Sequence, residues 1–146
     1  MTGTDPQRAS RQYLAAEVEG ADPLTRVAML HEAAARFIRQ AAAGIEEGEP
    51  ARAHEAFLRA KRIIAHFLAS IPEDDPSDLA ADLRGLFTFA YRRLAEANLR
   101  KDPHAARQAL QVVRTLGEGW AELTAHRGER PPQAPGAEPK TTTFLA

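Results

Sequence analysis

The chain has 146 residues, of which 44% are hydrophobic and 27% charged, a balance that indicates one folded domain and excludes wholesale disorder. Nineteen basic residues against twenty acidic ones give a net charge of -1, which supplies no overall attraction for nucleic acid or for an anionic membrane. The absence of cysteine excludes disulfides, zinc–thiolate sites and thiol catalysis, and it fits a cytoplasmic protein.

The first 22 residues contain a short amphipathic segment around Tyr13, Leu14 and Val18 that stops at Gly20. Such a segment is too short to be a stable helix alone, so we expect residues 1–22 to be partly helical and to need a surface to lie against. The segment lacks the features of a secretion signal, and no apolar run in the chain approaches the ~20 residues that span a bilayer. We therefore expect no membrane insertion and a cytosolic location.

Four acid–proline pairs divide the rest of the chain: Asp22-Pro23, Glu49-Pro50, Asp75-Pro76 and Asp102-Pro103. Proline is tolerated at the first position of a helix because the amide it lacks has no partner within the helix. The preceding acid can accept hydrogen bonds from free amides of the first turn, and aspartate does so better than glutamate. The pairs therefore predict four helix starts.

Apolar residues recur at intervals of three and four after each proline, the pattern of an amphipathic helix. The four stripes are Leu24, Val27, Leu30, Ala34, Phe37, Ile38, Ala41, Ile45; Ala53, Ala56, Phe57, Ala60, Ile63, Ile64, Phe67, Leu68; Leu79, Leu83, Leu86, Phe87, Ala90, Tyr91, Leu94, Ala97; and Ala106, Ala109, Leu110, Val113, Leu116, Trp120, Leu123. Gly48 and Pro50 leave room only for a tight reversal. The sequence predicts an all-α fold, an antiparallel up-down four-helix bundle over residues 23–124.

Residues 125–146 contain most of the late prolines and no apolar period, so we expect a disordered tail. The tail includes the short apolar stretch Phe144-Leu145, which is interpreted as an inert end rather than a docking peptide.

Signatures of enzymes and metal proteins are missing from the sequence. No Glu-x-x-His occurs, and the five histidines do not pair at i, i+4, so a carboxylate-bridged or histidine metal site is not expected. A P-loop, a dinucleotide-binding glycine pattern and a Gly-x-Ser-x-Gly elbow are also absent. We expect no catalytic activity, no cofactor and no metal. The single tryptophan, Trp120, is interpreted as a core residue rather than a partner-binding anchor.

Several ordered segments give the chain a likeness to a known family. They are Tyr13, Ala21-Asp22-Pro23-Leu24, Met29-Leu30, Gly48-Glu49, Ala60-Lys61-Arg62-Ile63-Ile64, and the string Tyr91-Arg92-Arg93-Leu94-Ala95-Glu96-Ala97-Asn98 followed by Asp102 and Trp120. Over residues 10–123 the chain resembles the FliS family of flagellar export chaperones, which guard flagellin. It departs from the family pattern at His31 and Phe87, where the family usually has tyrosine.

The resemblance implies a cytoplasmic chaperone that binds the disordered C-terminal region of flagellin, prevents its premature polymerisation and delivers it to the type III export gate. It also implies a monomer when loaded, and an amphipathic bundle with an apolar groove makes a homodimer possible when no client is bound. Partner-binding residues expected on this basis are Tyr13, Leu14, Leu30, His31, Phe37, Ile38, Phe87, Tyr91, Arg93, Glu96 and Asn98. The hypothesis for Tyr13 and Leu14 is that they cover an apolar groove until client displaces them, and the alternative is that this segment is frayed. Ordinary core packing is the alternative for most of the others.

Two other functions remain open at this stage. The bundle could be an adaptor for a different export component or a regulator, which identification of its client would reveal. It could also be an enzyme or metal protein on a helical scaffold, against which the missing motifs argue and which metal analysis would test.

Overall fold

The computed structural model describes residues 22–129, and within this range the fold consists of helices without strands. The helices are α2 (Pro23–Glu46), α3 (Pro50–Ser70), α4 (Asp78–Arg100) and α5 (Pro103–Glu129). The predicted four-helix bundle is confirmed. The expected N-terminal segment and residues 130–146 of the expected tail lie outside the described residues.

Three of the four predicted helix starts are confirmed, since α2, α3 and α5 each begin at the proline of an acid–proline pair. The Asp22 carboxylate accepts a bond from the Thr25 amide at 3.0 Å, whereas Glu49 makes no such capping bond. The fourth helix starts at Asp78 rather than near Pro76. Its cap is Ser77, whose hydroxyl accepts from the amide of Ala80 at 3.1 Å, because serine is as good a cap as aspartate.

The last helix is longer than its apolar stripe predicts, since α5 continues past residue 124 to Glu129. Its later turns carry helix-compatible side-chain contacts: Thr124 donates to the carbonyl of Trp120 at 2.9 Å, and His126 lies 3.6 Å from Glu122. Proline first returns at Pro131. An amphipathic stripe marks where a helix is buried, and the helix itself can continue until a residue that stops it.

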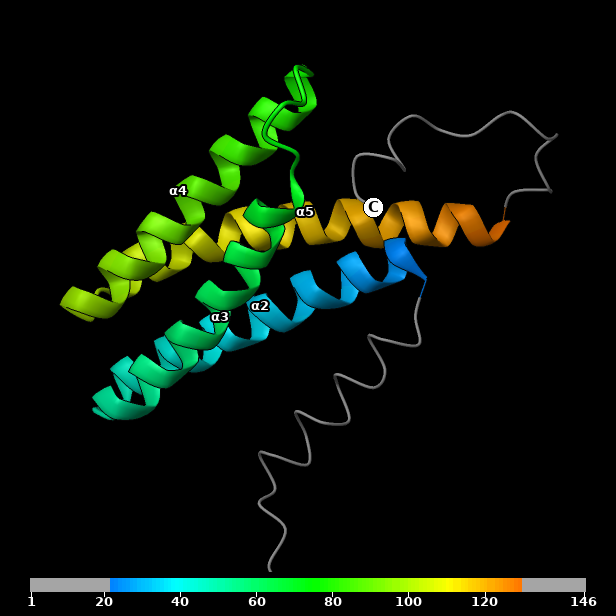
Figure 1. Ribbon diagram of the computed structural model, residues 1–146. Helices are drawn as coiled ribbons and strands as arrows, with labels where there is room; N and C mark the ends of the chain where they lie inside the picture. Colours follow the sequence, from blue (N-terminus) through cyan, green and yellow to red (C-terminus); the bar gives the residue numbers. More distant parts are fainter. Residues whose placement is uncertain (1–21, 130–146) are drawn as a thin grey trace, which may run out of the picture.

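Each helix runs antiparallel to the next, and α2 packs against α3 and α5 while α4 packs against the same two helices from the opposite side (Figure 1). We call the end that holds the α2–α3 and α4–α5 turns the closed end. The other end, formed by the start of α2, the end of α3, the start of α4 and the last turns of α5, is called the open end. Toward the open end the α3–α4 pair and the α2–α5 pair diverge (Figure 1).

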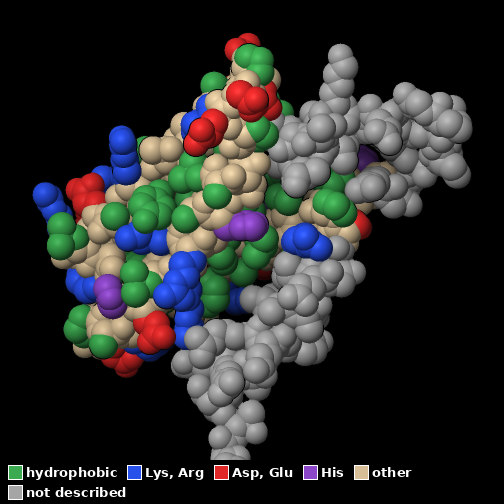
Figure 2. All heavy atoms as spheres, in the orientation of Figure 1, with side chains coloured by type: hydrophobic (Ala, Val, Ile, Leu, Met, Phe, Trp, Pro, Cys, Tyr) green, Lys and Arg blue, Asp and Glu red, His purple; other side chains and the backbone are tan. Residues whose placement is uncertain are grey.

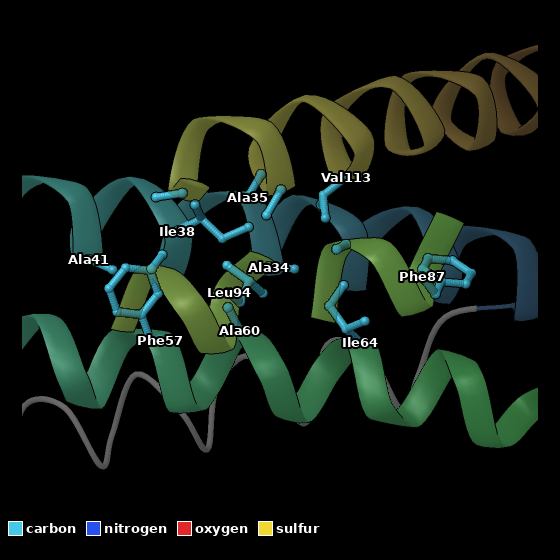
Figure 3. Packing of buried hydrophobic residues seen from close by; sticks show 14 of the residues in the cluster. Ala34, Ala35, Ile38, Ala41, Phe57, Ala60, Ile64, Phe87, Leu94 and Val113 are labelled. Carbon is cyan, nitrogen blue, oxygen red and sulfur yellow. The ribbon is translucent and has the colours of Figure 1, made fainter. Parts of the chain in front are cut away.

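Small residues dominate the core, which explains how the helices approach closely. Twelve of the buried hydrophobic residues that form the central cluster are alanines, and the larger ones are placed at intervals among them. Figure 3 shows Phe57 beside Ala41 toward the closed end, Leu94 and Ile64 in the middle, and Phe87 toward the open end. Among the described residues, no helix is both long enough and apolar enough to cross a membrane.

Candidate functional site

A cavity of about 280 Å³ lies at the open end, where all four helices contribute to its wall. Its lining consists of Pro23, Arg26, Val27, Leu30 and His31 from α2; His66, Phe67, Ser70 and Ile71 from α3 and its cap; Leu83 and Phe87 from α4; and Trp120 from α5. Figure 2 shows a histidine over the last turns of α3, with hydrophobic side chains beside it and a basic side chain to the right of them. The divergence of the two helix pairs opens the bundle at this level.

Three rings form the aromatic wall of the cavity. The His31 imidazole stacks on Phe67 with ring centroids 4.3 Å apart, and Phe67 stacks on Phe87 at 5.1 Å. The His31 and Phe87 rings are 5.8 Å apart and tilted. Such offset arrangements are favourable beyond the burial of apolar area, so the wall is a fixed feature of the open end.

His31 is the one polar residue that the described core buries, with 1% of its surface exposed. Its Nδ1 lies 2.8 Å from the carbonyl oxygen of Val27, one turn earlier. Burial lowers the pKa of the His31 imidazole from 6.5 to about 4, although the Val27 bond opposes this shift. At neutral pH the side chain is therefore uncharged.

The predicted residues Leu30, His31 and Phe87 are brought together at this cavity. Phe37 lies one to two turns further along α2, partly buried, with the guanidinium of Arg59 over its ring at 5.8 Å. Ile38 is 1% exposed within the core, so we leave it out of the proposed contact surface. Tyr13 and Leu14 lie outside the described residues.

The other predicted residues on α4 lie away from the cavity. Tyr91 faces α3, where the Lys61 ammonium lies 5.0 Å from its ring centroid. Asn98 also faces α3, with its side-chain nitrogen 2.8 Å from Nδ1 of His54.

Arg93 and Glu96 pair with each other one turn apart on α4. The Arg93 Nε is buried and has no hydrogen-bond partner in the described structure. Both residues border a shallow depression along α4 that also includes Phe89. The nine predicted residues within the described range thus fall into separate groups rather than one surface.

A second apolar surface runs along α4, where Leu79, Leu86 and Phe89 are each 40 to 44% exposed. On α5, Leu123 is also exposed. These side chains do not surround a cavity of the kind found at the open end. In the depression on α4, Phe89 lies among arginine side chains.

Sequence reasoning did not assign Phe67, Ile71, Leu83 and Trp120 to the site, although all four line the cavity. Trp120 is partly exposed rather than a core residue. A signal was present in the positions of the large residues: in antiparallel helices joined by short turns, residues equally distant from a turn lie at the same level. His31 and Phe67 stand 17 and 19 residues from Gly48, so their proximity follows from the turn.

Comparison with known proteins gives consistent matches along the chain. The family model for flagellar protein FliS matches residues 6–127, a range that includes every residue of the cavity wall. The flagellar secretion chaperone FliS of Salmonella typhimurium is 28% identical over 108 residues, covering 73% of this chain and 80% of that protein. The protein of the same name from Bacillus subtilis is 26% identical over 119 residues, covering 81% and 88% of the two chains.

Proposed function

Because this chain belongs to the flagellar protein FliS family, whose model matches residues 6–127, we propose that it binds the C-terminal region of flagellin and keeps it from polymerising before export. In this proposal the complex forms in the cytosol and is delivered to the flagellar type III export apparatus. The family membership carries the proposal, and the geometry of the open end supports it.

The open end has the properties that a binding site for an unfolded segment requires. Its cavity is lined mostly by apolar and aromatic side chains, and few polar groups lie among them. Grooves of this kind accept the apolar face of a segment that becomes helical as it binds. The client would fill space that the chaperone's own side chains do not fill.

The surface beside the cavity extends the proposed contact along α2. Leu30 and Phe37 are both partly buried on this helix and pack on the edge of the core. They are seven residues apart, which places them on one face of α2. A client helix laid along this face would contact both residues and enter the cavity at one end.

Binding of this kind is extensive yet reversible. Coupled folding of a disordered segment buries ~1,000 to 3,000 Å² of surface, and ordering the segment costs several kcal/mol of the gross interaction. A chaperone that must release its client to the export apparatus needs such a balance. The shape of the open end, formed by fixed aromatic rings, keeps the ordering cost mainly on the client.

Calorimetric titration with a peptide containing the C-terminal region of flagellin from the same organism tests the proposal. We expect one-to-one binding with a negative heat-capacity change, because apolar surface is buried. Leu30→Asp places a charge at the cavity wall and is expected to weaken binding at least ~10-fold, since an unpaired charge resists desolvation. Leu99→Asp is the matched control, because Leu99 is 83% exposed on α4 near the closed end.

Absence of binding by the folded protein would contradict the proposal and favour a different export component as client. Equal losses of affinity in Leu30→Asp and Leu99→Asp would contradict the assignment of the open end. Circular dichroism of both variants shows whether the helices are retained.

A further inference from the structure

The hydrogen bond of His31 fixes which tautomer the ring adopts. A carbonyl oxygen can only accept, so the 2.8 Å contact with Val27 requires that Nδ1 carries the proton. In the neutral ring Nε2 is then a hydrogen-bond acceptor with a free lone pair. Nδ1 is turned back toward α2, which places Nε2 on the side of the ring away from its own helix.

The Nε2 atom of His31 is buried and has no hydrogen-bond partner in the described part of the chain. An acceptor left without a donor in an apolar environment costs roughly 1 to 3 kcal/mol. Native proteins rarely retain such an atom without a donor supplied from elsewhere. His31 also lines the cavity at the open end, so a side chain that enters this space and displaces a neighbouring wall group brings its donor to Nε2.

The rings that pack on His31 do not provide a donor, and the donor groups of Arg26, Ser70 and Trp120 in the cavity wall make no hydrogen bond to Nε2. The rings of Phe67 and Phe87 pack on the imidazole, and neither ring carries a donor group. Gly117 of α5 lies so close that an added Cβ would stand 3.0 Å from the His31 Cβ. The imidazole is therefore held in place by apolar contacts on several sides while its acceptor is left for an incoming group.

We propose that the cavity is a socket for one aromatic side chain of the client that carries a hydrogen-bond donor, a tyrosine hydroxyl or a tryptophan N–H, and that His31 Nε2 accepts this bond. The inference rests on the proposed function and specifies what the open end selects. An aromatic ring suits a wall made of Phe67, Phe87 and Trp120. The donor distinguishes such a side chain from phenylalanine or leucine.

The physical basis of the selection is the cost of an unmade bond. In the described structure Nε2 is buried and unpaired, and a client ring without a donor leaves it so. A ring with a donor makes the missing bond and also gains the apolar contacts. Sites that offer a buried polar group discriminate strongly against analogues that leave it unpaired.

Small aromatic probes test the socket without any flagellin. p-Cresol reproduces the tyrosine side chain and toluene that of phenylalanine, and 3-methylindole reproduces tryptophan. Each is titrated into the full-length protein at pH 7 and followed by NMR of the amides and of the His31 ring nitrogens. We expect p-cresol and 3-methylindole to bind about 10-fold more tightly than toluene and to shift the Nε2 resonance.

Two variants show whether the preference depends on His31. His31→Phe retains a ring but removes the acceptor, and we expect p-cresol and toluene then to bind equally. His54→Phe is the matched control because His54 is exposed on α3 and bonds Asn98 outside the cavity. It should leave the preference unchanged.

A second pair of variants covers the case in which His31→Phe does not fold. Gly117→Ala brings a Cβ to 3.0 Å from the Cβ of His31 and should displace the imidazole, whereas Gly119→Ala adds a Cβ that meets nothing within 4 Å. We expect Gly117→Ala to reduce the p-cresol preference at least threefold and Gly119→Ala to leave it intact.

Equal or tighter binding of toluene to the unmodified protein would overturn the proposal, as would probe-induced shifts confined to residues away from the cavity. Persistence of the preference in His31→Phe would also overturn it. Failure of the flagellin peptide to bind, with the probe preference present, would reject flagellin as the client and leave the socket established. The two claims therefore fail separately.

Discussion

The closed and open ends of the bundle are built from different residues and differ in how completely they are filled. At the closed end, Gly44 of α2 faces Ala53 of α3 so closely that an added Cβ would lie 3.0 Å from the Ala53 backbone nitrogen. At the open end, His31, Phe67 and Phe87 meet around a cavity of about 280 Å³. Small residues permit close helix packing, whereas large rings hold the diverging helices apart.

The closed end is also fixed by its turns. Gly48 has φ of 71°, a left-handed conformation that glycine adopts without steric cost, and the Glu49 amide donates to the carbonyl of Gly44 at 2.8 Å. Arg52 contacts the carboxylates of Glu47 and Glu49 at 2.6 and 2.9 Å. These contacts hold α2 and α3 in register.

If the open end is the binding site, as proposed, the difference teaches that stability and recognition belong to separate halves of one bundle. In the closed half the core residues pack closely against one another, and Leu99 is a large hydrophobic residue left exposed there. The open half retains apolar surface and an unpaired acceptor, both of which favour binding. Substitutions at the two ends should therefore affect different measured quantities.

The largest expected loss of stability comes from the closed half. Phe57→Ala removes a fully buried ring and should lower the free energy of unfolding by about 3 to 5 kcal/mol. Trp120→Ala at the open end should cost less, because Trp120 is only partly buried and already borders a cavity. Urea denaturation measures both. A larger loss for Trp120→Ala would contradict the division between the ends.

Protonation of His31 gives the open end a pH dependence. The pKa falls from 6.5 to about 4 on folding, so below pH 6.5 the unfolded chain binds a proton that the folded chain does not. The free energy of unfolding therefore has its full value, as far as His31 is concerned, above pH 6.5, and it falls as the pH is lowered from 6.5 to about 4. At 1.36 kcal/mol per pKa unit the loss is about 3 kcal/mol.

Denaturation of the protein and of His31→Phe over this pH range checks the effect. The variant should lack this part of the decline. The other ionisable groups in the described cavity wall are Arg26 of α2 and His66 of α3, while the wall residues of α4 and α5 are apolar or aromatic. If the free energy of unfolding declined equally in both proteins, the His31 imidazole would not be the source of the pH dependence.

A pair of glycine substitutions compares packing at the closed end with open surface. Gly44→Ala should lower the free energy of unfolding by about 1 to 3 kcal/mol, because the new Cβ meets the backbone of α3. Gly85→Ala on α4 adds a Cβ that meets nothing within 4 Å, and alanine favours a helix by up to about 1 kcal/mol. Gly85→Ala should therefore stabilise the protein. If Gly44→Ala also stabilised the protein, α2 and α3 would have to move apart at the closed end to accommodate the new Cβ without cost.

The smallest expected effect is at the α4–α5 turn. Lys101 has φ of 51°, a conformation that disfavours residues with a Cβ. Lys101→Gly should raise the free energy of unfolding by about 0.5 to 1 kcal/mol. Lys101→Ala loses the same ammonium, which donates to Asn98, but keeps the Cβ. Thermal denaturation should show stabilisation only for glycine.

The sequence predicts the bundle well because the relevant signals are local. Acid–proline pairs mark three helix starts, and Gly48 marks the first turn. The predicted start of α4, near Pro76, was wrong by about half a turn, because Ser77 rather than Asp75 is the capping residue. The end of α5 was missed because the loss of an apolar stripe does not stop a helix.

The site was predicted less completely because it depends on packing between helices. Leu30, His31 and Phe87 lie at the cavity, but Ile38 has the same apolar character as Leu30 and is buried in the core. A stripe alone does not distinguish a core residue from one at the edge of a cavity. The unpaired Nε2 of His31 depends on its bond to Val27 and on three neighbouring helices, which the sequence pattern does not encode.

Hydrogen exchange of the protein alone and with the flagellin C-terminal peptide tests most directly whether the open end is the binding end. We expect peptide-dependent protection in the first turns of α2, the last turns of α3 and the region around Phe87 and Trp120, with the closed-end turns at Gly48 and Lys101 unchanged. Protection concentrated at those turns, or along the exposed Leu79, Leu86 and Phe89 surface of α4, would contradict the account.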